Sequence, residues 1–89
     1  MIYVLVSHPV QDFNVWKPFF DSDQPRLNAA GARMVKIFRS FDTPNNVSIL
    51  FSAPSKEVFD ALVHDPVLPE LMKKAGVTAP PTFQFFTEV

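Results

Sequence analysis

Two side chains of this sequence, His8 and Arg39, have the chemistry to act on one small molecule from two sides. A histidine transfers protons near neutral pH, and an arginine guanidinium holds a carboxylate or enolate oxygen. The two residues lie far apart in the sequence, so the fold has to bring them together. We expect His8 and Arg39 to be the catalytic residues of any active site that the chain forms.

Aromatic residues that could enclose a ligand accompany this pair. Trp16 offers a face on which an aromatic ligand could stack. An apolar pocket with a few polar groups is the usual form of a small-molecule site. The predicted ligand-binding residues are Trp16, Phe20, Phe51 and Phe83, and the expected ligand is a small hydrophobic metabolite.

Each of these residues also has a structural interpretation. His8 precedes Pro9 at a strand end, where a solvent-facing histidine is ordinary. Arg39 could pair with Asp42 or extend its charged head from the edge of a sheet. Trp16 and the phenylalanines recur at helical spacing, which is also typical of a plain core. The sequence leaves both interpretations open.

Other chemistries find little support in the residue types. Two histidines and no cysteines make a poor set of metal ligands, so we expect no metal and no cofactor. The pair His64-Asp65 lies between two expected helices, where Asp65 suits a helix cap. The only two glycines, Gly31 and Gly76, cannot form a phosphate-binding loop. No glycine-rich turn surrounds a serine in the way that a nucleophile elbow requires.

Length, charge and composition limit the class of protein. The 89 residues form a single domain, 1–89, and a chain this short buries only about 60 to 65% of its unfolded surface. Ten phenylalanines and 47% hydrophobic residues favour the burial of a second surface. The net charge of −1 argues against nucleic acid and anionic membranes as partners. The apolar start lacks a basic leader, which favours a cytoplasmic location.

The elements that must position these residues follow from periodicity and breaker residues. Asp12, Ser55 and Asp65 suit helix caps, Pro18 should kink the first helix, and Pro25 should restart it. Gly31 and Gly76 suit helix ends. The expected strands are 2–7, 33–41, 47–53 and 82–89, and the expected helices lie in 13–31, after Ser55, and in 66–75.

The hairpin of the second and third strands carries apolar residues on both faces. Closing it over the loop 42–46 sets Phe41 opposite Val47, Arg39 opposite Ile49 and Ile37 opposite Phe51. One face should lie under the helices with Val35, Ile37, Phe41, Val47, Ile49 and Phe51. The other face, with Phe38 and Leu50, should remain open.

The order βαββαβ predicts an α+β protein of the ferredoxin-like type, a four-stranded antiparallel sheet with helices on one face. In the strand order 4-1-3-2, one strand separates His8 from Arg39, so the two should lie about 10 Å apart. An open apolar sheet face most economically packs against a second copy, which predicts a homodimer. The alternative is a monomer with scattered exposed apolar residues.

The order of several short motifs adds a family resemblance over nearly the whole chain. These are Trp16-Lys17-Pro18 with Phe20-Asp21, Ala29-Ala30-Gly31, Phe38-Arg39 with Asp42, Pro44-Asn45 and Val47, and Ala75-Gly76-Val77 with Pro80-Pro81. In this order they resemble small bacterial proteins of the dimeric α+β barrel superfamily. The chain is similar to a branch often described as like antibiotic-biosynthesis monooxygenases or cyclases.

The resemblance implies a fold and an assembly more than a reaction. In the superfamily two ferredoxin-like protomers pack their sheets into a barrel, and pockets form between helices and sheet. Its members include cofactor-free quinone-forming monooxygenases, haem-degrading monooxygenases, muconolactone isomerases and polyketide-shaping enzymes. The Asn, Trp and His set of the haem-degrading branch does not map onto this chain, because the first strand has no asparagine and Trp16 lies on the first helix.

Two functional hypotheses follow. The first is a cofactor-independent monooxygenase-, isomerase- or cyclase-like enzyme that acts on a small aromatic or enolisable metabolite. The second is a non-catalytic dimeric module that binds a small molecule or has a structural role.

Overall fold

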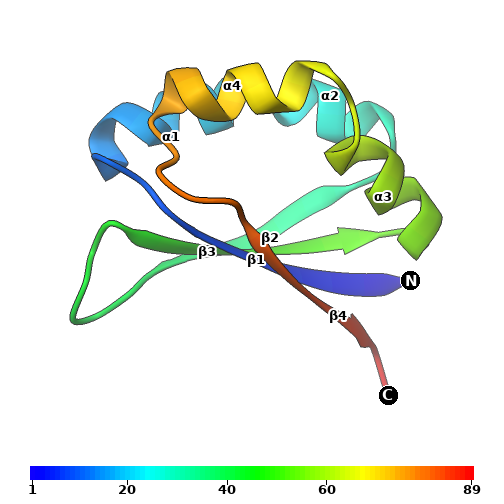
Figure 1. Cartoon of the computed structure of the whole chain (residues 1–89). Coiled ribbons are helices and arrows are strands. Elements are labelled where there is room, and N and C mark those ends of the chain that lie inside the picture. The colour runs from blue at the N-terminus through cyan, green and yellow to red at the C-terminus, as the bar shows by residue number, and fades with distance from the viewer.

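The computed structural model describes residues 1–89 and has two layers, with every helix on the same side of one sheet (Figure 1). The strands are β1 (Ile2–Pro9), β2 (Arg33–Arg39), β3 (Asn46–Ala53) and β4 (Thr82–Thr87). The helices are α1 (Phe13–Ser22), α2 (Gln24–Ala29), α3 (Lys56–Val63) and α4 (Val67–Ala75). No helix is both long enough and apolar enough to cross a membrane.

The sheet has the strand order β2-β3-β1-β4, and the pairs are antiparallel. This topology confirms the predicted ferredoxin-like fold. The central strand β1 places Val4 and Val6 opposite Phe51 and Ile49 of β3, and all four side chains are buried beneath the helices. The hydrophobic core therefore lies between the helices and one face of the sheet.

The first helical region breaks at Asp23 and not at Pro18. The Asp12 side chain accepts a hydrogen bond of 2.9 Å from the Asn14 N–H and so begins α1. Pro18 lies inside α1, which continues to Ser22. A second helix, α2, starts around Pro25, as the sequence predicts.

The second helical region begins and ends at the predicted caps. The Ser55 hydroxyl accepts a 3.3 Å hydrogen bond from the Val58 N–H at the start of α3. Asp65 accepts a 3.0 Å hydrogen bond from the Val67 N–H at the start of α4, and Gly76 ends this helix in the left-handed conformation. The pair His64-Asp65 therefore lies in the turn between α3 and α4, and Asp65 has the expected capping contact.

The register of the β2–β3 hairpin differs from the prediction by two residues. Arg39 pairs with Val47 and Ile37 pairs with Ile49, while Phe41 lies beyond β2 and is 99% exposed. The last bond between the two segments runs from the Ser40 N–H to the Asn46 carbonyl, and the Asn46 N–H bonds to the Thr43 carbonyl within the loop. The loop is therefore longer than 42–46, and the placement of Phe41 under the helices was wrong.

A second difference lies at the start of β2. The ladder shifts between Met34 and Lys36, so Met34 pairs with Phe51 while Lys36 pairs with Leu50. A bulge of this kind inserts one extra residue and reverses the alternation on one side of it. Val35 occupies the bulge and is 46% exposed, so its predicted burial under the helices was also wrong.

The opposite face of the sheet has no helix over it (Figure 1). Phe38 pairs with Ser48, and Leu50 pairs with Leu5 of β1, on the face away from the buried Val47 and Ile49. Phe86 of β4 lies opposite Tyr3 on this same face. Phe38 and Phe86 are each 48% exposed, so the open face carries large apolar side chains, as predicted.

The two glycines offer a matched test of the connections around the helices. Gly31 has a φ of 90° and Gly76 a φ of 84°, and a left-handed residue with a Cβ costs about 1 to 2 kcal/mol. A Cβ on Gly31 would approach the Pro54 ring to 3.0 Å, whereas one on Gly76 would meet the Gln11 side chain at 3.5 Å. We expect Gly31→Ala to lower the free energy of unfolding by more than Gly76→Ala, measured by urea denaturation. Equal losses would show that the Pro54 contact relaxes freely.

Candidate functional site

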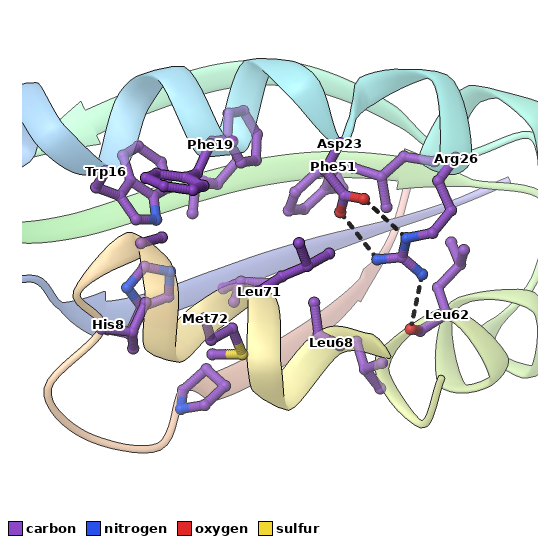
Figure 2. Close-up of a pocket in the computed structure, with 18 of the residues that line it drawn as sticks. His8, Trp16, Phe19, Asp23, Arg26, Phe51, Leu62, Leu68, Leu71 and Met72 are labelled. Atoms are coloured by element: carbon purple, nitrogen blue, oxygen red, sulfur yellow. Dashed lines mark hydrogen bonds and ion pairs between the residues drawn. The ribbon is translucent and has the colours of Figure 1, made fainter. Parts of the chain in front are cut away.

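A pocket of about 110 Å³ lies between the helices and the sheet (Figure 2). Twenty residues line it, and sixteen of them are hydrophobic. The only polar side chains among the lining residues are those of His8, Asp23 and Arg26. This combination of an apolar wall with few polar groups is the expected form of a small-molecule site.

The fold brings five of the six predicted site residues together at this pocket. The alternation of β1 puts His8 on the same face as Val4 and Val6, directly under the helices. The predicted ligand-binding residues come from one helix and two further strands and also line the pocket: Trp16, Phe20, Phe51 and Phe83. No ligand tests their roles, which stay predictions.

The aromatic residues form a continuous wall. Trp16 and Phe20, four residues apart on α1, stack with ring centroids 4.9 Å apart and planes 20° from parallel. The ring centroids of Phe20 and Phe51 of β3 lie 6.1 Å apart. Those of Phe51 and Phe59 of α3 lie 5.6 Å apart, and those of Phe59 and Phe83 of β4 lie 6.3 Å apart. Offset and edge contacts of this kind are favourable for aromatic pairs. The wall therefore links the helices to the sheet along one side of the pocket.

His8 is the polar residue at the Trp16 end of the pocket. Its ring lies 5.7 Å from the Trp16 ring in an edge-on arrangement (Figure 2), and the residue is only 8% exposed. Its Nδ1 is the one buried side-chain nitrogen or oxygen without a hydrogen-bond partner. Burial lowers the pKa of His8 below the ordinary histidine value, so the ring is neutral at physiological pH. A neutral imidazole with a free nitrogen can accept or donate a proton.

Arg39, the other predicted catalytic residue, does not line this pocket. Pairing across β3 places His8, Val47 and Arg39 in one row of the sheet, so the backbone spacing is the expected one of about 10 Å. The exposed guanidinium instead lies 4.2 Å from the centre of the Phe13 ring and donates a 3.0 Å hydrogen bond to the Pro44 carbonyl. These contacts tie the hairpin loop to the start of α1.

Two charged pocket residues, Asp23 and Arg26, were missed in the sequence. Arg26 donates from Nε and Nη2 to the two oxygens of Asp23, each at 2.9 Å. Its Nη1 reaches the Leu62 carbonyl at 3.2 Å and the Asp65 carboxylate at 3.4 Å. The hydrogen bonds with Asp23 raise the pKa of Arg26 above its ordinary value, so it remains charged. The only sequence feature that could have indicated the pair is the spacing of three residues between Asp23 and Arg26, with Pro25 between them.

Acidic and histidine side chains do not gather elsewhere. No group of three or more His, Cys, Asp or Glu residues is arranged to hold a metal ion.

Solved structures with the same fold carry several names. A Bordetella bronchiseptica protein provisionally named an antibiotic biosynthesis monooxygenase superposes with a TM-score of 0.80 at 17% identity, covering 99% of this chain and 96% of that one. A Caulobacter crescentus protein with the same provisional name gives 0.75 at 14% identity, covering 99% and 89%. An uncharacterised NIPSNAP domain protein from Burkholderia xenovorans gives 0.68 at 12% identity, covering 100% and 95%.

No protein-family model and no curated protein sequence matches the chain. At these low identities the structural matches show the fold alone. The predicted resemblance is thereby confirmed at the level of the fold: the chain shares the ferredoxin-like α+β fold of proteins provisionally named antibiotic biosynthesis monooxygenases.

The lowered pKa of His8 predicts how stability depends on pH. Between the folded pKa and the ordinary value of about 6.5, the unfolded chain binds more protons than the folded one. The contribution of neutral His8 is therefore fully present above pH of about 6.5 and is lost as the pH falls toward the folded pKa. We expect His8→Gln to flatten the dependence of the free energy of unfolding on pH in this window, measured by urea titrations.

His64→Gln is the matched control, because this second histidine is exposed on the turn between α3 and α4. It should retain the pH dependence of the unmodified chain. An equal flattening by both substitutions would show that burial of His8 is not the cause.

Proposed function

We propose that the pocket binds a small aromatic or enolisable molecule and that His8 transfers a proton to or from it, in a cofactor-independent reaction of the monooxygenase, isomerase or cyclase type. The observation that carries the proposal is the buried His8 ring, which has an unpartnered Nδ1 and lies beside Trp16 in an apolar pocket. A buried polar atom without a partner costs free energy, and a ligand group in the pocket would satisfy it.

The pocket suits a molecule with one aromatic ring. An apolar protein cavity of about 150 Å³ holds benzene, and the pocket of about 110 Å³ is only somewhat smaller. Burial keeps the imidazole neutral and thus ready to accept a proton from a phenol or from a carbon next to a carbonyl. The names of the structural neighbours agree with such a reaction, although the shared fold by itself specifies none.

A second candidate function is binding without catalysis. The pocket contains one residue suited to proton transfer, and the predicted partner Arg39 lies outside it. A module that stores or senses a hydrophobic metabolite needs no more than this.

One experiment separates the two functions. Acetophenone binding is followed through the fluorescence of Trp16, the only tryptophan, and exchange of its methyl protons in D₂O is followed by NMR. For an enzyme we expect binding with accelerated exchange, and a loss of about 100-fold or more in exchange rate for His8→Gln, since acid–base residues contribute that much. His64→Gln should exchange protons like the unmodified chain.

Binding of acetophenone without accelerated exchange would contradict His8 catalysis and support the binding module. Absence of any binding would contradict both functions.

We also propose that the open sheet face pairs with a second copy of the chain. Phe38 and Phe86 are about half exposed there, Leu5 and Leu50 lie between them, and no helix of the same chain covers them. An apolar face of this kind is stabilised when a twin sheet packs against it.

Sedimentation equilibrium tests the dimer. We expect the unmodified chain to show the mass of two copies at micromolar concentration and Leu50→Lys to show the mass of one, because the charge would be buried between the sheets. Val15→Lys is the control, since Val15 is an exposed apolar residue on α1, on the other side of the molecule. A monomeric unmodified chain would contradict the proposal.

A further inference from the structure

The end of the pocket away from His8 is charged. Asp23 and Arg26, from the junction of α1 and α2, line the pocket there, and Figure 2 shows Arg26 held between the Asp23 carboxylate and the Leu62 carbonyl. The Arg26 side chain is 23% exposed and that of Asp23 17%. A partly buried ion pair in an otherwise apolar wall influences which ligands can enter.

The guanidinium retains one hydrogen-bond donor. Arginine has five N–H groups, and four of those on Arg26 reach acceptors on Asp23, Leu62 and Asp65. The remaining N–H belongs to Nη2, which in Figure 2 lies on the side of the guanidinium toward Leu71. Leu71 is itself a pocket residue, so this donor is available to an acceptor oxygen of a ligand.

The cluster has no positive charge to spare for an anion. One guanidinium faces two carboxylates, those of Asp23 and Asp65, which leaves an excess of negative charge. His8 at the opposite end is neutral, and the pocket wall contains no other cation. An anionic ligand would lose its hydration in an apolar space and meet this negative excess.

We propose that the Asp23–Arg26 pair is a specificity determinant, which selects an uncharged aromatic molecule with a carbonyl or ether oxygen and excludes the corresponding carboxylate. The oxygen accepts the remaining Arg26 N–H while the ring lies against the aromatic wall. This inference rests on the proposed function, since it specifies the ligand class of the same pocket.

Three probes of similar ring size test the selectivity: methyl benzoate is neutral with a carbonyl, benzoate is its carboxylate, and toluene lacks the oxygen. Their dissociation constants are measured at pH 7.5 by isothermal titration calorimetry on the full chain. We expect methyl benzoate to bind about tenfold more tightly than benzoate, and more tightly than toluene.

The outcomes separate this inference from the proposed function. Binding of benzoate as tight as that of methyl benzoate overturns the selectivity and leaves the proposed function standing. Binding of toluene as tight as that of methyl benzoate overturns the hydrogen bond from Arg26. If none of the three probes binds, both the inference and the proposed function are overturned.

A charge-neutralising variant provides a second test. Asp23→Asn keeps the size of the side chain and one acceptor for Arg26 but removes a negative charge. Benzoate should therefore bind about fivefold more tightly to this variant than to the unmodified chain. Asp21→Asn is the matched control: it makes the same change of net charge at an exposed residue on α1 that pairs with Lys17 outside the pocket.

Asp65→Asn repeats the test if Asp23→Asn fails to fold, because asparagine can still cap α4 and the same negative charge is removed. An unchanged benzoate affinity in the folded variants, or an equal gain in Asp21→Asn, would overturn the proposal.

Discussion

The alternation of side chains along the central strand β1 is the constraint on which the rest of the structure depends. β1 pairs with β3 on one side and β4 on the other, so its alternation sets which residues of all three strands face the helices. Val4 and Val6 enter the core, and the same period carries His8 into it two residues later. The alternation of β1 thus buries the polar imidazole ring of His8. Its Nδ1 has no hydrogen-bond partner within the protein and is free to form a hydrogen bond with a ligand.

The helices that cover the sheet above the pocket are short. Each of the two helical regions consists of two helices: α1 ends at Ser22 just before α2, and α3 ends at Val63 shortly before α4. Asp23, in the first of these junctions, and Asp65, in the second, both bond to Arg26. Through its contacts with Leu62 and Asp65, Arg26 thus links the first helical region to the second at the end of the pocket opposite His8.

The position of Arg39 shows why two residues on one face need not share a site. Its backbone lies in the predicted row with His8, yet it is on the edge strand β2, where a long side chain can turn outward. There the Arg39 side chain contacts Phe13 and the Pro44 carbonyl while its charge remains exposed to solvent. The arginine at the far end of the pocket is instead Arg26, which is paired with the carboxylates of Asp23 and Asp65.

Local sequence patterns determined the element order, most caps and the two-faced sheet, because each depends on spacing of two, three or four residues. Asp12, Ser55 and Gly76 specify their helix ends through contacts within a few residues. The bulge at Val35, the early end of β2, the outward turn of Arg39 and the contact of Arg26 with Asp65 were decided only by the tertiary structure. They depend on contacts between segments whose relative positions no local spacing encodes, and the polarity of the pocket depends on the same contacts.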